Sequence, residues 1–126
     1  MKTRAFGNVC ETVVSRWLEQ KGYKVIARNY TIRGAELDLV ATDSETLVFI
    51  EVKSRHFGYD KSKYGRPSRA VDHIKRQRIA LAAQSFLKQY PSNKRKRFDV
   101  IEVIADEQPT YTSFDMKHFK SAFTLR

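Results

Sequence analysis

Two apolar segments separated by a short polar stretch constrain this fold more than any other feature of the sequence. Residues 36–42 and 47–52 are rich in Leu, Val, Ile and Phe, and residues 43–45 between them are polar. Segments of this length and composition are typical of the two strands of a hairpin. Residues 47–50 are apolar on both faces, so the second strand should lie in the centre of a sheet that is covered on both sides.

Around this hairpin the sequence predicts a single α/β domain. Apolar residues recur at three- and four-residue spacing before Gly22 and before Pro91, which indicates two amphipathic helices. Loose alternation after Gly22 and a β-branched segment after Arg97 indicate two more strands. The expected order is helix, strand, strand, strand, helix, strand, over residues 6–18, 23–30, 36–42, 47–52, 70–90 and 98–104. We therefore expect a mixed sheet flanked by helices, a basic turn at residues 93–97, and an aromatic tail, residues 110–126, that packs back on the core.

Composition limits the class of protein to a basic domain without disulfides. The chain has 126 residues, about one domain, and 24 Lys and Arg against 14 Asp and Glu give a formal net charge of +10. Its single cysteine cannot form an internal disulfide. The longest apolar run, residues 79–83, is far shorter than the roughly 20 residues of a membrane helix, and no signal-peptide core follows the basic N-terminus. We expect a cytoplasmic protein whose positive field attracts nucleic acid and which has no membrane partner; a basic surface without such a role is the alternative.

Three acidic residues and a lysine interrupt the two central strands. Period two places Glu36 and Asp38 on one face of the first strand, and Glu51 and Lys53 on one face of the second. The loop length decides whether these faces coincide, because directly opposed residues of an antiparallel pair share a face. With an even loop, such as residues 44–45 alone, Asp38 lies opposite Glu51, and Glu36 opposite Lys53. An odd loop would separate the acids.

With the even loop, the carboxylates of Asp38 and Glu51 lie so close that they require a cation between them. Their β-carbons would be about 5 Å apart, and like charges at that distance destabilise each other. Oxygen ligands with water suit Mg²⁺ or Mn²⁺, whereas one cysteine and three scattered histidines do not support zinc. Lys53 would offset charge on a phosphate or help to deprotonate water. The alternative is a solvent-exposed face that carries ion pairs.

A basic segment directly follows Lys53. Lys and Arg greatly outnumber Asp over residues 54–78, and aromatic residues are interleaved with them. Contacts with phosphates would supply affinity without sequence preference, and the aromatic rings would stack on unpaired bases. The candidate nucleic-acid contacts are Arg55, Lys63, Arg66, Arg69, Lys75 and Arg78. A solvated basic loop is the alternative.

Several segments between about residues 7 and 123 carry a family resemblance. They include Gly34-x-Glu36-Leu37-Asp38-Leu39-Val40, Val48-Phe49-Ile50-Glu51-Val52-Lys53-x-Arg55 and Arg97-Phe98-Asp99-Val100. Asp38 followed by Glu51-x-Lys53 resembles the signature of the Asp…Glu-x-Lys nuclease superfamily, which includes restriction endonucleases and Holliday-junction resolvases. The wider set is similar to the bacterial YraN-type family, which is largely uncharacterised and is assigned to that superfamily chiefly by fold. The resemblance implies a restriction-endonuclease-like core.

The resemblance also implies roles for individual residues. The catalytic set that it implies is Asp38, Glu51, Lys53 and Glu11. Mg²⁺ or Mn²⁺ would be held by the two strand carboxylates and the backbone carbonyl of Val52. Lys53 would orient or activate the attacking water, and Glu11 would bind a second ion or a water. Glu36 would support the site, either by pairing with Lys53 or by contacting an arginine.

Together these observations predict a Mg²⁺-dependent endonuclease that hydrolyses phosphodiester bonds of DNA in preference to RNA. Branched and single-stranded DNA are the candidate substrates. One alternative is a nucleic-acid-binding module without catalysis on the same fold, and another is a basic scaffold that docks a protein partner. The similarity to resolvases leaves a homodimer open.

Overall fold

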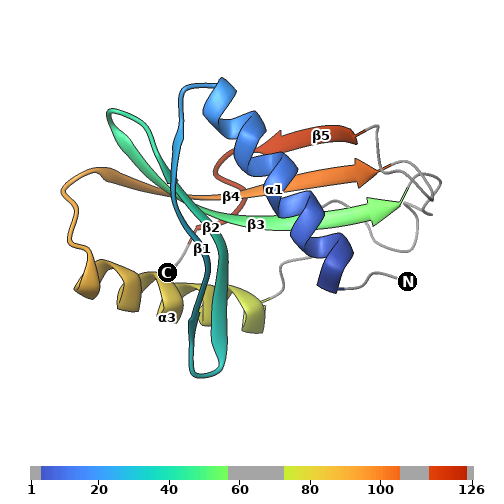
Figure 1. Cartoon of the computed structure of the whole chain (residues 1–126). Coiled ribbons are helices and arrows are strands. Elements are labelled where there is room, and N and C mark those ends of the chain that lie inside the picture. Colours follow the sequence, from blue (N-terminus) through green and yellow to red (C-terminus); the bar gives the residue numbers. More distant parts are fainter. Residues whose placement is uncertain (1–3, 57–72, 106–113, 125–126) are drawn as a thin grey trace.

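The computed structural model describes residues 4–56, 73–105 and 114–124, and these ranges contain two helices and five strands (Figure 1). In chain order they are α1 (Arg4–Gln20), β1 (Lys24–Ile32), β2 (Ala35–Thr42), β3 (Thr46–His56), α3 (His73–Gln89), β4 (Arg95–Ala105) and β5 (Phe114–Phe119). The predicted α/β order of helix, three strands, helix and strand is confirmed, and the tail adds a further strand.

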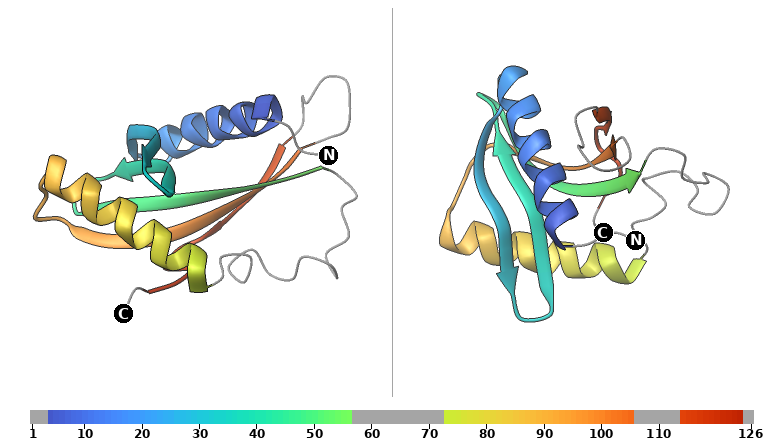
Figure 2. Two further views of the ribbon diagram at one scale, coloured as in Figure 1. Left: turned by 90° about the horizontal axis from the view of Figure 1, so that it is seen from below. Right: turned by 45° about the vertical axis from the view of Figure 1, so that its right-hand side comes forward.

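A mixed sheet separates the two helices. Its strand order is β1-β2-β3-β4-β5, and every neighbouring pair is antiparallel except β3 and β4, which are parallel because the chain returns through α3. Figure 2 shows α1 and α3 on opposite sides of the sheet. Apolar side chains of α1, such as Val14, pack on one face, and those of α3, such as Phe86, pack on the other. Val48 and Phe49 of β3 are buried on opposite faces, as expected of a central strand.

The β2–β3 hairpin has the register of an even loop. Its paired residues are Leu39 with Ile50, Val40 with Phe49, Ala41 with Val48, and Thr42 with Leu47. The Asp43 N–H donates to the Thr46 carbonyl, and the Asp43 carboxylate accepts from the N–H groups of Glu45 and Thr46 at 2.9 and 2.7 Å. An aspartate that bonds its own turn in this way stabilises a tight connection. Of the even and odd loops that the sequence left open, the structure has the even one.

Beyond the pair of Leu39 and Ile50 the two strands separate. The β2–β3 ladder ends there, whereas β2 stays paired with β1 as far as Ala35 and β3 stays paired with β4 as far as His56. Figure 1 shows the β1–β2 hairpin bending away from β3. The sheet is therefore forked, and the acidic residues that follow the last pair lie at the fork.

The ends of several elements differ from the sequence-based boundaries. Gly22 ends α1 as predicted: its φ is 94°, and the Tyr23 N–H donates to the Leu18 carbonyl at 3.0 Å. The predicted basic turn over residues 93–97 is too long, because β4 already begins at Arg95, opposite Thr46 in the parallel ladder. The first residues of β4 pair with β3 beside the β2–β3 turn, where the Arg95 N–H donates to the Glu45 carbonyl at 3.2 Å, and this pairing brings them into the sheet.

The described part of the tail, residues 114–124, packs on the core. Strand β5 pairs antiparallel with β4, the Ala122 N–H donates to the Phe98 carbonyl at 2.9 Å, and the Phe123 ring is buried beneath α3. Neither described helix is long and apolar enough to cross a membrane.

Candidate functional site

Asp38 and Glu51 lie side by side at the fork between β2 and β3. One oxygen of Asp38, Oδ2, accepts the Val52 N–H at 2.8 Å and so replaces the ladder bond that β2 no longer supplies. The Asp38 side chain is also hydrogen-bonded to Glu51. In an extended strand the N–H and C=O of one residue point the same way. The Val52 carbonyl is therefore on the side of Asp38, and three oxygen donors converge from two strands.

Burial makes the two carboxyl groups share a proton. It raises the pKa of Asp38 to about 9, and the hydrogen bond and negative charge of Glu51 add to that rise. Burial also acts to raise the pKa of Glu51, but the hydrogen bond from Asp38 and the charges of Lys75 and Lys53 outweigh it and lower that pKa. At neutral pH and without a cation, Asp38 is protonated and Glu51 is ionised.

Two lysines contact the same oxygen of Glu51. Lys53 Nζ, from β3, is 3.4 Å from Oε2, and Lys75 Nζ, from α3, also contacts Oε2. Burial and the neighbouring charge of Lys75 lower the pKa of Lys53, against the opposing charge of Glu51. Burial lowers the pKa of Lys75 as well, but Glu51 outweighs it and the net shift is upward. The lysine of lower pKa, Lys53, is better suited to exchange a proton.

Lys75 is the site residue whose place sequence reasoning missed. It was assigned to a basic surface for nucleic acid, whereas the structure brings it to the central carboxylate. The helix pattern could have indicated this position. Lys75 precedes Ile79, Ala82 and Phe86 at spacings of three and four, and those three residues are buried against the sheet. A lysine at the end of an apolar stripe packs its aliphatic stem toward the sheet, which brings its ammonium group near acidic side chains of the strands.

Glu11 approaches the fork from α1, on the opposite side of the sheet. Its side chain is 12% exposed, and Arg28 Nη2 is 3.9 Å from Oε1. Burial raises the pKa of Glu11, against the opposing hydrogen bond from Asn29 and the charge of Arg28, and Glu51 adds to the rise. Oε1 is buried and has no hydrogen-bond donor within the described part of the chain. Glu11 thus faces the acidic pair with one oxygen available.

Glu36 is separated from Lys53 by the fork. The extended register would place these two residues opposite each other, but the ladder ends before they meet, and Lys53 pairs with Glu51 instead. Thr31 Oγ1 donates to Glu36 Oε2 at 3.1 Å across the β1–β2 hairpin. Of the two predicted roles for Glu36, pairing with Lys53 is not found.

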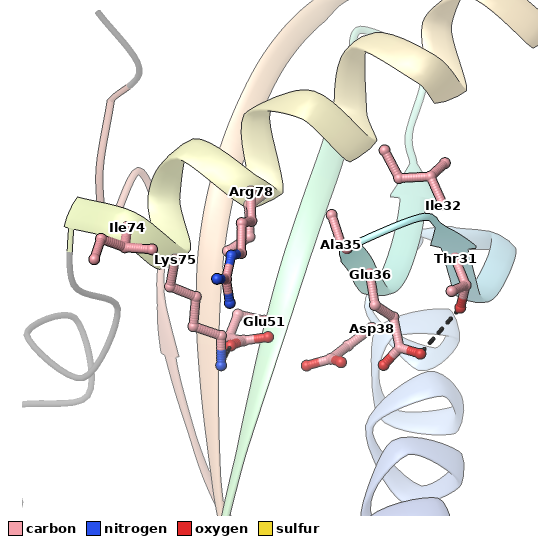
Figure 3. Close-up of a pocket in the computed structure, with 11 residues that line it drawn as sticks. Thr31, Ile32, Ala35, Glu36, Asp38, Glu51, Ile74, Lys75 and Arg78 are labelled. Atoms are coloured by element: carbon pink, nitrogen blue, oxygen red, sulfur yellow. Dashed lines mark hydrogen bonds and ion pairs between the residues drawn. The ribbon is translucent and has the colours of Figure 1, made fainter.

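A pocket of about 820 Å³ leads to the acidic pair. One wall is the end of the β1–β2 hairpin, with Thr31 and Glu36, and the other is the start of α3, with Lys75 and Arg78. Figure 3 shows Lys75 and Arg78 extending from α3 toward Glu51, with Glu36 and Thr31 on the far side. The pocket is therefore cationic on its helical wall and acidic at its base.

The other predicted nucleic-acid contacts are distributed differently. Lys63, Arg66 and Arg69 lie outside the described residues. The sequence predicts Arg55 on an open surface that contacts nucleic acid. In the structure Arg55, at the end of β3, is buried, and its guanidinium donates to the Ser54 carbonyl at 3.3 Å. The parallel pairing of β3 with β4 continues through Arg55 and holds it inside the sheet.

A second charged cluster surrounds Asp99 on β4. Asp99 is fully buried; it accepts from Arg97 at 2.8 and 2.9 Å, from the Ser121 N–H at 3.0 Å, and lies 2.6 Å from His118 Nε2. Arg97 also donates to the Tyr23 hydroxyl. Burial acts to raise the pKa of Asp99, but the bonds from His118 and Arg97 outweigh it and lower the pKa. This cluster ties β5 to β4, and sequence reasoning did not identify it.

The donor set at the fork fits a hard divalent cation. Within residues 4–56, 73–105 and 114–124, no group of three Asp, Glu, His or Cys side chains could hold a metal by itself. A cation would therefore rely on Asp38, Glu51, the Val52 carbonyl and water, which is an oxygen-only set suited to Mg²⁺ or Mn²⁺. Lys53 and Lys75 balance the charge of Glu51, whereas Asp38 keeps its proton and Glu11 Oε1 accepts no hydrogen bond within the described part of the chain, so these two side chains are the ones that a cation would affect most.

Comparison with known proteins connects the chain to one family. The profile of the uncharacterised protein family UPF0102 matches residues 10–103. The chain is similar to a UPF0102 protein of Geobacter metallireducens, with 36% identity over 99% of this chain and 97% of the relative. A UPF0102 protein of Prosthecochloris aestuarii is 39% identical over 93% and 91% of the two chains, and one of Beutenbergia cavernae is 41% identical over 79% and 82%.

Proposed function

The chain belongs to the uncharacterised protein family UPF0102, and we propose from its site that it is a metal-dependent nuclease. The reaction would be hydrolysis of phosphodiester bonds, with Mg²⁺ or Mn²⁺ as the cofactor. We further propose that the chain is a member of the Asp…Glu-x-Lys nuclease superfamily. The order of elements and the placement of Asp38 and of Glu51-x-Lys53 on neighbouring strands support that assignment.

The observation that carries this proposal is the convergence of Asp38, Glu51 and Lys53 at the open end of a hairpin. A buried carboxylate, Glu51, that shares a proton with a half-buried carboxyl group, Asp38, is costly in a fold, and ion pairs alone would need only one of them. A divalent cation in place of the shared proton would allow both to ionise. A salt-bridged surface, the alternative reading of these residues, would leave them exposed, whereas Glu51 is only 6% exposed.

Different residues of the pocket would have different roles in hydrolysis. Asp38, Glu51 and the Val52 carbonyl would hold the cation, and Glu11 of α1 would bind a second ion or a water. The cation would supply Lewis-acid stabilisation of negative charge at phosphorus. Lys53, with its lowered pKa, would orient the attacking water and accept or return its proton. Arg78 would hold phosphate oxygens at the mouth of the pocket.

We propose DNA, in branched or single-stranded form, as the substrate in preference to RNA. The acidic pair lies at the base of a pocket between the β1–β2 hairpin and α3. A flexible strand can enter such a recess more easily than a continuous rigid duplex can. The net charge of +10 supplies attraction for any polyanion, so the pocket and not the charge has to select the form of nucleic acid.

The test compares the wild-type protein with Asp38→Ala on junction, flap, single-stranded and duplex DNA and on single-stranded RNA. We expect cleavage in Mg²⁺ or Mn²⁺, no cleavage in EDTA, and a loss of at least about a hundredfold in the variant. Asp115→Ala is the matched control, because Asp115 is an exposed aspartate on β5 at the far edge of the sheet. Binding that weakens steeply with salt, without cleavage by either protein, would favour the non-catalytic module. No binding at all would favour a scaffold for a protein partner.

A further inference from the structure

We propose that Lys75 is a positioning residue that holds Glu51 until a divalent cation binds and then gives up the Glu51 oxygen to that cation. The inference rests on the proposed function, because it takes Asp38 and Glu51 as the metal ligands. It adds a residue from α3 to a site that otherwise comes from the β2–β3 hairpin and α1.

The geometry around Glu51 Oε2 is the basis of this proposal. Lys75 and Lys53 both contact this one oxygen. A carboxylate oxygen that already contacts two ammonium groups has little room for a cation as well. A cation bound to Glu51 would also repel both ammonium groups at short range. One of the lysines must therefore withdraw when the cation arrives.

Exposure and attachment indicate that Lys75 is the lysine that moves. The Lys53 side chain is 12% exposed and lies two residues from Glu51 on the same strand. The surrounding atoms therefore restrict its movement away from Glu51. The Lys75 side chain is 44% exposed and reaches Glu51 from the separate wall formed by α3. A four-carbon stem of this kind can swing between partners at small cost.

The same pocket provides the second partner for Lys75. Its ammonium group lines the pocket together with Arg78, one turn farther along α3. A phosphate that approached the cation would lie between these two side chains. Lys75 would thus exchange Glu51 for a phosphate oxygen of the substrate, and this exchange would couple metal binding to nucleic-acid binding.

The first experiment measures Mn²⁺ affinity without nucleic acid, by electron paramagnetic resonance of the free ion. The proteins are wild type, Lys75→Met and Arg78→Met, at one pH and ionic strength, with Asp38→Ala to define the site. Methionine keeps the aliphatic stem and removes the charge. We expect Lys75→Met to bind Mn²⁺ about tenfold more tightly than wild type, because the competing ammonium group is gone. Arg78→Met, which removes one charge from the same wall, should gain less than about threefold.

The outcomes separate this inference from the proposed function. Equal affinity in wild type and Lys75→Met would overturn the role of Lys75 and leave the metal site standing. An equal gain in Mn²⁺ affinity in Lys75→Met and Arg78→Met would also overturn the role of Lys75. The loss of one positive charge anywhere on the pocket wall would then explain the gain. Absence of Mn²⁺ binding in every protein would overturn both proposals. Circular dichroism and thermal unfolding establish that each variant is folded.

A second experiment tests the transfer to phosphate. The affinity for single-stranded DNA is measured in Ca²⁺, which supports binding with little cleavage in many metal nucleases, and in EDTA. Lys75→Met should lose about three- to tenfold in Ca²⁺ and less than about twofold in EDTA, because without a cation the ammonium group is already engaged by Glu51. An equal loss under the two conditions would contradict the exchange, and a purely structural role for Lys75 would produce that equal loss.

Discussion

Asp38 keeps a proton that an exposed aspartate would lose well below neutral pH. The cause lies in its surroundings: burial is the largest contribution, and the ionised Glu51 beside it adds to the effect. The Val52 N–H opposes the rise by stabilising the charged form. A divalent cation bound beside Asp38 would favour loss of this proton.

The metal-free protein should lose stability as pH rises, because of Asp38. Its pKa is about 9 in the folded state and 3.8 when unperturbed, so between those values the native state binds a proton that the unfolded state has released. The free energy of unfolding should therefore fall over this window, by up to about 1.4 kcal/mol per pH unit. Urea unfolding in EDTA from pH 5 to 8 measures the slope.

Asp38→Asn provides the control for this prediction. Asparagine cannot ionise and can still donate to Glu51, so its stability should change much less over the same pH range. If wild type and Asp38→Asn show the same slope, Asp38 is not the group responsible, and the description of the shared proton is wrong.

At the scale of elements, α3 adds basic side chains to the site that the β2–β3 hairpin forms. The helix packs on β2 and β3 through small and aromatic side chains, Ala82 and Ala83 among them, which let its backbone approach the sheet closely. That close approach brings Lys75 within reach of Glu51. The helix was predictable from its periodicity, but its distance from the sheet depends on the volume of these few residues.

Ala82→Leu should destabilise the fold by overpacking the contact between α3 and the sheet. Ala82 is fully buried, so the added side chain must displace the helix or its neighbours, at a cost of about 1 to 3 kcal/mol in the free energy of unfolding. Gln84→Leu adds an apolar side chain at an exposed position of the same helix and should change stability by less than about 0.5 kcal/mol. Urea unfolding compares the two, and a similar small change in both would mean that α3 is not tightly packed at Ala82.

At the scale of the whole molecule, the net positive charge and the fork between β2 and β3 have different effects. The net charge of +10 attracts polyanions from a distance, whereas the fork in the sheet creates the one place in the described chain where buried acids meet a cationic wall. The Asp99 cluster contributes differently, since it ties the tail to β4 and so completes the sheet beside the site.

DNA binding should weaken linearly with salt on a logarithmic plot, and individual pocket cations should contribute to the slope. Arg78→Met should reduce the magnitude of the slope by about 0.7 if Arg78 contacts a phosphate of a single strand. Asp115→Asn changes the net charge by one unit in the opposite direction, far from the pocket, and should leave the slope unchanged within error. The measurement is fluorescence anisotropy from 50 to 300 mM salt. Equal slopes in wild type and Arg78→Met would exclude Arg78 from the contact surface.

The sequence by itself determined the order of elements and the central place of β3, and it limited the hairpin to two kinds of register, of which the even one opposes Asp38 to Glu51. These follow from local physics: a period of two along a strand and a period of 3.6 along a helix. The loop found in the structure is the even one, stabilised by Asp43. The packing of the tail was also predictable, from its aromatic residues alone.

Tertiary structure alone decided where the register stops, and hence that Glu36 is separated from Lys53. It also decided that Lys75 reaches Glu51, that Arg55 is buried, and that Asp99 joins His118. Each of these depends on how far a sheet twists or how closely a helix approaches it. Such distances are set by packing between residues remote in the sequence, and no local pattern encodes them.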